Sequence, residues 1–519
     1  MRRKFLNSIA LIAVVAATSS PPPLMPVAAA ESQRTQGFCR NADPLPDIGQ
    51  ERDWQAEQDR RDREAARSEY SGGDHMVRDE AVRDEAVTML VVPPPLSPAP
   101  PPPAMASGGE EGKISVTSTR RDLPLMDSPI AMPSPPRPYP QSQPQSGLLT
   151  AGEHDDLLNP ELYAAYVRRS NLAQRISDLP RVDTLNVVTV KVADASGRAI
   201  PFAEVRVTCS DGGSITMATQ ADGTAIFFPG LDRLSERINV SARQDGRIIA
   251  ATRPALISSK SGGQTIGLTA DTTDTRVEKL DLMFVIDTTG SMGDEIRYLQ
   301  SELRTIIANV TDKHRGIDIR LGFVFYRDQG DDYVTYSVDF ERDIGRQQGI
   351  LAKQRANGGG DYPEAMDQAL VRAVAHQWRP DAVKSLFLVA DAPPHNDKFG
   401  RTWAAAEAAR AKRIHITPIA ASGVAGEAEY AMRAMAAATQ SRYLFLTDDS
   451  GVGNAHAAPA IDCYLVTRLD ALVRRVVDSQ LSGRRIEPDK NEVIRAVGKY
   501  DAGKCILPRG YRWDQGQAG

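Results

Sequence analysis

Short apolar runs alternate with helical stretches between residues 280 and 482. The apolar runs lie at 282–286, 319–326, 385–390, 414–420 and 443–446, and an alternating run at 333–339 predicts an edge strand. The helical stretches lie at 293–310, 344–356, 364–377, 402–412, 427–438 and 464–480. Strands that are apolar on both faces and alternate with helices predict a doubly wound α/β fold, in which helices cover both faces of a parallel sheet.

Acid and hydroxyl side chains follow the first of these strands. Asp287 ends the apolar run, and Thr289 and Ser291 follow it at alternate positions. Open α/β sheets bind ligands at the carboxyl ends of their strands, and carboxylate and hydroxyl oxygens suit a hard dication such as Mg²⁺ or Ca²⁺. The alternative is a helix cap, because Thr and Ser commonly precede helices for that reason.

The pattern Asp287-x-Thr289-x-Ser291 resembles the metal-site motif of von Willebrand factor type A domains. Two further stretches are similar to the second and third metal loops of that family, namely residues 358–365 (GGGDYPEA) and 391–395 (DAPPH). The resemblance covers roughly 279–484 and implies a Rossmann-like domain over 278–484. Thr289 stands where Ser is commoner in the family, but it keeps the hydroxyl.

The resemblance also implies a set of ligands for a Mg²⁺ or Mn²⁺ ion. Thr289, Ser291 and Glu364 would touch the ion directly. Asp287 and Asp391 would hold it through water molecules. Because Mg²⁺ takes octahedral oxygen coordination, one position is left for a carboxylate from an Asp or Glu of a protein partner.

Some relatives carry a neighbouring Ca²⁺ site. The residues that match it here are Asp328 and Asp361, but Gly359 stands where those relatives have an Asn. His395 follows the third loop closely, and its simplest interpretation is a histidine that packs within the loop.

The chain before this domain divides into four segments. Residues 1–30 are typical of a secretory signal, with Arg2-Arg3-Lys4, an apolar stretch too short for a bilayer, and small residues at 28–30. We therefore expect a periplasmic or secreted protein without a transmembrane segment after signal removal; the alternative is an uncleaved anchor. Residues 31–150 are charged and Pro-rich and are predicted to be disordered. Residues 151–182 are predicted to be helical, mainly over 153–178.

Residues 183–272 alternate in the manner of β-strands and predict an all-β sandwich domain. The pattern resembles carboxypeptidase regulatory-like domains, which implies a spacer or a binding module. The residues that carry this resemblance are Asp194, Gly197, Pro201, Ala203, Val205, Asp222, Gly223, Ala225 and Phe227.

The four cysteines allow three disulfide pairings in an exported chain. We favour Cys463 with Cys505, which would tie the C-terminal tail (485–519) to the preceding domain. The net charge of −5 and the lack of a basic stripe speak against nucleic-acid binding. Residues 498–505 come close to a phosphate-binding loop but end in Cys505, where that loop needs a hydroxyl.

These features favour an exported, non-enzymatic adhesion or scaffold module that captures a partner's carboxylate through its cation. The alternative is an accessory subunit that recruits a substrate for a separate envelope enzyme. Hydrolysis at the ion itself is disfavoured, because the sequence offers no general base besides the acids already assigned to the ion.

Overall fold

The computed structural model describes residues 37–52, 54, 60–61, 63–64, 147–176, 178–179, 181–257, 262–272, 276–293, 295–424, 426–451 and 456–509. The predicted signal sequence and most of the predicted disordered segment lie outside these residues. One compact unit comprises 1–57 and 144–519, and the other comprises 58–143. All elements below belong to the first unit. Within the described ranges, no helix combines the length and the apolar character needed to cross a membrane.

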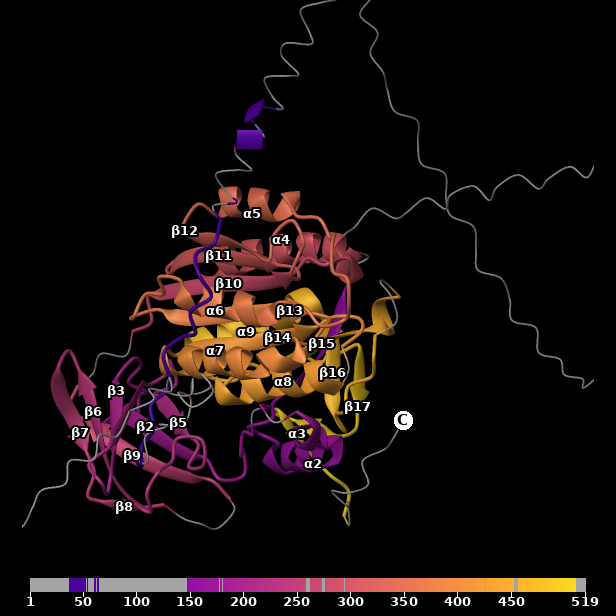
Figure 1. Ribbon diagram of the computed structural model, residues 1–519. Coiled ribbons are helices and arrows are strands. Elements are labelled where there is room, and N and C mark those ends of the chain that lie inside the picture. The colour runs from indigo at the N-terminus through magenta and orange to yellow at the C-terminus, as the bar shows by residue number, and fades with distance from the viewer. Residues whose placement is uncertain are drawn as a thin grey trace, which may run out of the picture. The chain divides into compact units, whose positions relative to one another are not determined.

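A nine-stranded mixed sheet forms the centre of the α/β domain (Figure 1). Five neighbouring strands, β11, β10, β13, β14 and β15, run parallel, and antiparallel strands extend the sheet at both edges. In sheet order the strands are β12 (Thr335–Glu341), β11 (Asp318–Tyr326), β10 (Lys279–Asp287), β13 (Val383–Ala390), β14 (Ile414–Ala420), β15 (Tyr443–Thr447), β1 (Thr150–His154), β16 (Tyr464–Arg468) and β17 (Arg495–Val497).

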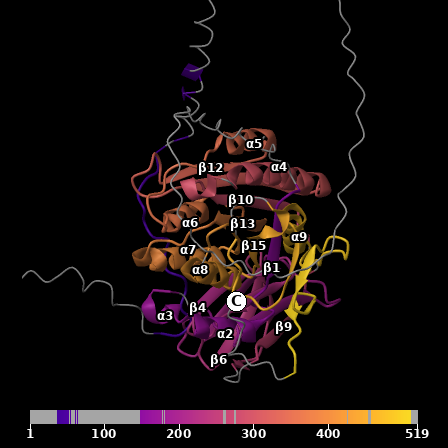
Figure 2. The ribbon, with the colours of Figure 1, turned by 90° about the vertical axis from the view of Figure 1, so that its right-hand side faces the viewer.

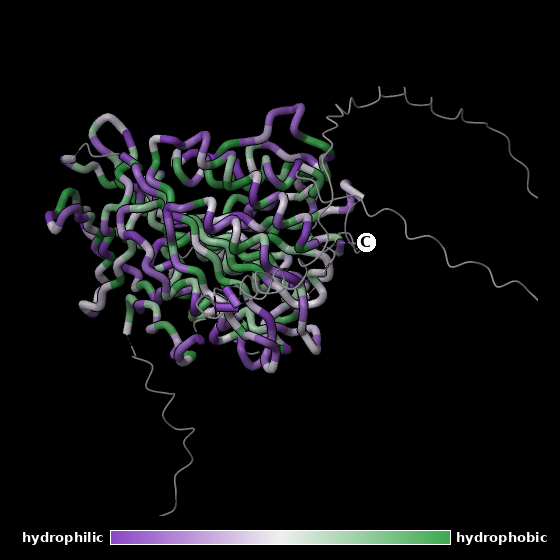
Figure 3. Tube along the Cα trace, turned by 90° about the horizontal axis from the view of Figure 1, so that it is seen from above, coloured by the Kyte–Doolittle hydropathy of each residue, from purple (hydrophilic) through white to green (hydrophobic). Residues whose placement is uncertain are grey.

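Helices cover both faces of this sheet (Figure 2). One face carries α4 (Ile296–Lys313), α5 (Ile344–Lys353) and α9 (Leu469–Ser482), and the other carries α6 (Met366–Ala375), α7 (Phe399–Ala411) and α8 (Gly426–Ala438). Side chains of β10 alternate between the apolar cores on the two faces of the sheet. Phe284 belongs to the core beneath α4 and α9, and Val285 to the core beneath α6, α7 and α8. The strands at the centre of Figure 3 are accordingly mostly hydrophobic. The predicted α/β fold is confirmed, with a mixed rather than a purely parallel sheet.

Strand β1 corrects the predicted helical segment. Residues 150–154 pair antiparallel with both β15 and β16, so they belong to the sheet of the α/β domain. The helices begin later, as α2 (Pro160–Ser170) and α3 (Leu172–Arg175). The prediction was therefore wrong for residues 151–159, and the helices end at Arg175, before the predicted bound. The predicted helix at 464–480 likewise begins as strand β16 and becomes helical at Leu469.

Strand β1 approaches its neighbour β15 closely at Gly152. A Cβ atom added at Gly152 would lie 2.3 Å from the ring of Phe445 on β15. Glycine at this position therefore lets the two strands pair with the aromatic ring above the backbone of β1.

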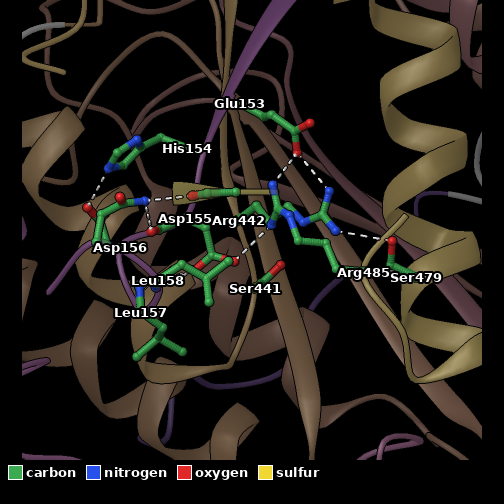
Figure 4. Close-up of polar contacts among 12 residues, drawn as sticks. Glu153, His154, Asp155, Asp156, Leu157, Leu158, Ser441, Arg442, Ser479 and Arg485 are labelled. Atoms are coloured by element: carbon green, nitrogen blue, oxygen red, sulfur yellow. Dashed lines mark hydrogen bonds and ion pairs between the residues drawn. The ribbon is translucent and has the colours of Figure 1, made fainter. Parts of the chain in front are cut away.

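A buried ion cluster surrounds the next residue of β1 (Figure 4). Glu153 is fully buried and lies 2.7 Å from Arg442, which precedes β15. Arg475 of α9 and Arg485 of the tail each approach Glu153 to 3.4 Å, and Arg485 also pairs with Asp155. The cluster ties β1, α9 and the tail together.

Residues 188–270 form two small sheets around one apolar core. One sheet contains β5, β2 and β9, and the other contains β4, β3, β6, β7 and β8. Inward and outward side chains alternate along β3 and β6, as the sequence predicts for half-buried strands. The bounds are β2 (Val188–Asp194), β3 (Glu204–Cys209), β4 (Ser214–Ala218), β5 (Thr224–Phe227), β6 (Arg237–Gln244), β7 (Arg247–Ala251), β8 (Ala255–Leu256) and β9 (Gln264–Ala270).

The two-sheet region packs firmly against the α/β domain. Arg410 of α7 donates two hydrogen bonds of 2.7 Å to the carboxylate of Asp232 and a third to the carbonyl of Ile226. At a second contact, a Cβ at Gly483 would lie 2.7 Å from the backbone of Ala221 and Asp222. These contacts link the two regions through buried, specific interactions.

The stretch 37–52, which we name the N-terminal strap, corrects part of the predicted disordered segment. Its Cys39 forms a disulfide with Cys209 of β3, and Arg40 pairs with Glu407 of α7. Leu45 and Ile48 then pack against the core of the α/β domain. In Figure 1 the strap is the indigo trace that runs along this domain.

The C-terminal tail returns to the sheet. Cys463 and Cys505, the pair favoured from the sequence, are joined by a disulfide. Beyond β17, the tail forms a small hairpin of β18 (Tyr500–Asp501) and β19 (Lys504–Cys505). The near-match to a phosphate-binding loop thus lies in a hairpin, without the helix that such a loop requires.

Candidate functional site

Loops at the carboxyl ends of neighbouring strands bring the predicted site residues together. Asp287 ends β10, and Asp391 follows β13, which pairs with β10 in parallel. Thr289 immediately precedes the short helix η3 (Gly290–Gly293), and Ser291 lies within that helix. Glu364 precedes α6, and its backbone N–H donates to the carbonyl of Pro393 in the third loop, at 3.0 Å.

Hydrogen bonds within the first loop fix both hydroxyls. The backbone N–H and the hydroxyl of Thr289 donate to Oδ1 of Asp287, at 2.9 and 2.7 Å. The hydroxyl oxygens of Thr289 and Ser291 lie 3.1 Å apart. Asp287 therefore orients the hydroxyl of Thr289, which in turn contacts the hydroxyl of Ser291.

Gly359 allows the second loop to approach the first. A Cβ at this position would lie 2.8 Å from Oε1 of Glu364 and 3.1 Å from Cβ of Thr289, and the φ angle of +73° also favours glycine. Glu364 and Thr289 are thus adjacent, and the Asn that some relatives carry would collide with them.

The site concentrates negative charge in a buried position. Burial, followed by the charge of Asp391, raises the pKa of Asp287 to about 7. Burial, followed by the charges of Asp287, Asp328, Asp391 and Asp331, raises the pKa of Glu364 to about 9. Oδ2 of Asp287 and Oε2 of Glu364 are buried and have no hydrogen-bond partner among the described residues.

This donor set fits a hard divalent cation. A cation would offset the crowded carboxylates and occupy their unpaired oxygens, which suit Mg²⁺ or Mn²⁺ better than softer metals. Within the described residues, no three Asp, Glu, His or Cys side chains are grouped closely enough to hold a metal by themselves. A cation at this site would therefore depend on the hydroxyls of Thr289 and Ser291.

The residues proposed for a second cation have different neighbours. Asp328 lies 2.8 Å from Nε2 of His395, whereas Asp361 is exposed. Asp331 holds the loops instead, since its Oδ2 accepts from the backbone N–H groups of Asp328 and Gly359. His395 is thus a side-chain partner of Asp328.

Three aromatic residues at this edge were missed from the sequence. The hydroxyls of Tyr333 and Thr288 lie 2.8 Å apart, and the ring of Trp54 lies 5.9 Å from that of Tyr333. Tyr362 is 47% exposed, and its hydroxyl donates to the carbonyl of Gly423. The alternation at 333–339 predicted a strand. No local pattern indicates that the ring of Trp54 contacts Tyr333, because this contact joins distant parts of the chain.

Comparison with known proteins agrees with the fold of this domain. Residues 281–457 match the sequence family of the von Willebrand factor A domain. This part of the chain, with its helix-covered mixed sheet, is therefore a von Willebrand factor A domain.

Two curated proteins are each similar to part of the chain. One is the alpha-protein kinase vwkA of Dictyostelium discoideum, 30% identical over 130 residues, which are 24% of this chain and 20% of that protein. The other is a putative ariadne-like RING finger protein of Acanthamoeba polyphaga mimivirus, 35% identical over 127 residues, which are 24% of this chain and 12% of that protein. The chain thus spans a fifth or less of the length of these relatives.

Solved structures give weaker matches. The conserved hypothetical protein BatB from Bacteroides thetaiotaomicron is 10% identical with a TM-score of 0.28, and the match covers 39% of this chain and 98% of that one. The pilus adhesin SpaC from Lactobacillus rhamnosus GG, in its open conformation, is 12% identical with a TM-score of 0.26, covering 38% of this chain and 29% of that one.

Proposed function

We propose that the von Willebrand factor A domain of this chain binds a protein partner through a Mg²⁺ or Mn²⁺ ion, as an adhesion or scaffold module. Thr289, Ser291 and Glu364 would touch the ion, and Asp287 and Asp391 would hold it through water. When bound, the ion supplies an electrophilic position that an Asp or Glu carboxylate of the partner can occupy. We assign binding rather than catalysis to this site.

The observation that supports this proposal is the crowding of carboxyl groups at the strand ends, where buried oxygens of Asp287 and Glu364 have no hydrogen-bond partner among the described residues. Buried carboxylates are normally paired with a cation or a donor, because an isolated buried charge is costly. Here Glu364 keeps a buried oxygen without a partner, and its pKa rises to about 9. The first loop presents two oriented hydroxyls beside it. Carboxylates and hydroxyls around one point favour a hard cation over a structural ion pair.

The proposal includes export to the periplasm or the cell exterior. The predicted signal sequence motivates it, and the two disulfides support it, since such bonds persist in oxidising compartments. The two-sheet region would then act as a rigid base that presents the cation site.

Calorimetric titration of the full chain tests the cation site. After treatment with EDTA, the protein is titrated with MgCl₂ and with MnCl₂, and Asp287→Ala is compared with Asp397→Ala, the same change at an exposed acid after the third loop. We expect Asp287→Ala to lose binding and Asp397→Ala to keep it. Because burial disfavours the charge of Asp287, the Asp287→Ala variant should remain folded in a thermal melt.

Unchanged affinity in Asp287→Ala would reject the site assignment. Partner capture tests the second half of the proposal, with Mg²⁺ in one arm and EDTA in the other. Equal capture of a partner in both arms would mean that binding does not depend on the cation.

A further inference from the structure

The only Asn-Gly pair in the chain lies at the cation site. The backbone N–H of Asn357 donates to the carbonyl of Thr288, at 3.0 Å. The carbonyl of Gly358 accepts from the N–H of Gly290, at 2.9 Å. The pair is therefore fastened to the loop that carries Thr289 and Ser291.

The Asn357 side chain is open to chemistry. It is exposed, and no hydrogen bond to its amide is found among the described residues. Gly358 carries no side chain to shield its nitrogen, and its φ angle of +80° is one that other residues adopt at a cost. Steric hindrance at the nitrogen is thus at its minimum.

A carboxylate lies against Gly358. A Cβ at this position would come 2.4 Å from Oδ1 of Asp331, so the carboxylate lies beside Gly358 in the space that a side chain would fill. Oδ2 of Asp331 is held by the N–H groups of Asp328 and Gly359, at 3.0 and 2.9 Å. These two bonds fix the carboxylate and leave Oδ1 to accept a further proton.

We propose that Asn357 is a site of spontaneous deamidation, with Asp331 as the general base. The Gly358 nitrogen gives its proton to Oδ1 of Asp331 and attacks Cγ of Asn357. The new N–Cγ bond closes a succinimide, the Cγ–Nδ2 bond breaks, and ammonia leaves with the proton from Asp331. Water then opens the ring at either carbonyl, which yields aspartate or isoaspartate at position 357. No oxidant or reductant is needed.

The product would change the loop in two ways. Isoaspartate lengthens the backbone by one methylene, which displaces the Gly358 carbonyl from Gly290 and Gly359 from Glu364. Either product adds a carboxylate next to acids that already repel one another. The chemical step stands without the proposed function, whereas its effect on cation binding rests on it.

Peptide mapping by mass spectrometry tests the chemical step on the full chain, aged at neutral pH. Three samples run beside it: a synthetic peptide of residues 350–365, Asn357→Gln and Asp331→Asn. We expect the folded chain to lose ammonia at position 357 at least as fast as the peptide, with isoaspartate detected by enzymatic methylation. Asn357→Gln should show no change at this position. Asp331→Asn should slow the reaction about tenfold or more, since a positioned general base is typically worth ~10²–10⁴ in rate.

Two outcomes would overturn the proposal. One is a folded chain that keeps Asn357 while the peptide converts. The other is an Asp331→Asn variant that converts at the parent rate. Asp331→Glu retains a carboxylate, so partial recovery of the rate would separate base catalysis from a loop that has merely loosened. Titration of Asn357→Asp with MgCl₂ then reports the effect on the cation; if the parent chain binds none, the proposed function fails while the mapping result stands.

Discussion

The buried carboxylate of Glu153 should make the stability of the fold depend on acid pH. Burial disfavours the charge of Glu153, but Arg442, Arg485 and Arg475 outweigh it and lower its pKa from 4.5 to about 2. One pKa unit corresponds to about 1.4 kcal/mol, so the ionised group contributes about 3 kcal/mol to folding at neutral pH. Because the pKa is lowered, this contribution is present above pH 4.5 and is lost as the pH falls towards 2.

The test is Glu153→Gln, which keeps the shape of the side chain and removes its charge. At pH 7 three arginines would lose their shared partner, and a buried pair broken on one side typically costs about 3–5 kcal/mol. The difference in the free energy of unfolding between the variant and the parent should narrow by about 2 kcal/mol on going from pH 7 to pH 3. At pH 3 Glu153 is protonated in the unfolded parent but still mostly ionised in the folded one, whose pKa is about 2.

Urea unfolding at a series of pH values measures both the destabilisation at pH 7 and its decrease towards pH 3. Glu161→Gln, an exposed change in the first turn of α2, serves as the control for a lost surface charge. A Glu153→Gln variant as stable as the parent at pH 7 would refute the reasoning. A difference that stays constant down to pH 3 would show that the carboxylate is not the titrating group.

Three further changes probe the packing. Arg433→Met should destabilise the fold by about 3–5 kcal/mol in urea unfolding, because Arg433 is 1% exposed and its removal leaves the buried acids Asp156 and Glu429 without their cation. Adding Asp156→Asn should recover part of the lost stability. Replacing Cys463 and Cys505 by Ser should lower the free energy of unfolding by about 4 kcal/mol, since that disulfide closes a loop with a sequence separation of 42. A reducing agent should have no effect on the tail of this variant, because the tail then has no disulfide to break. A variant as stable as the oxidised parent would contradict this prediction. Gly152→Ala should cost about 1–3 kcal/mol through overlap with Phe445, and Phe445→Leu in the same chain should restore part of it; no effect in the melting temperature would mean that β1 pairs less closely than described.

The strands and helices around the cation site follow from local sequence. The run 282–286 is apolar at every position because both faces of β10 are covered, one by α4 and α9 and the other by α6. Such runs can be recognised without knowing their neighbours. The predicted site residues lie at the ends of these elements, so the sequence placed Asp287, Glu364 and Asp391 near one another.

Strand β1 shows where local reasoning stops. Its five residues, Thr150-Ala151-Gly152-Glu153-His154, contain a glycine and two ionisable groups and show no apolar alternation. Their conformation is set by β15 and β16, which lie far later in the chain and pair with β1 on both sides. A residue's preference for a strand depends on such neighbours as much as on its own side chain.

The sequence by itself determined the alternation of strands and helices, the order of the loops at the sheet's edge and the oxygen-bearing side chains that they carry. All of these depend on side-chain periodicity over a few residues. Only the tertiary structure decided where the N-terminal strap docks and that three arginines surround Glu153. The physical reason is that disulfide geometry, desolvation and charge pairing depend on distances between remote segments, which no local pattern specifies.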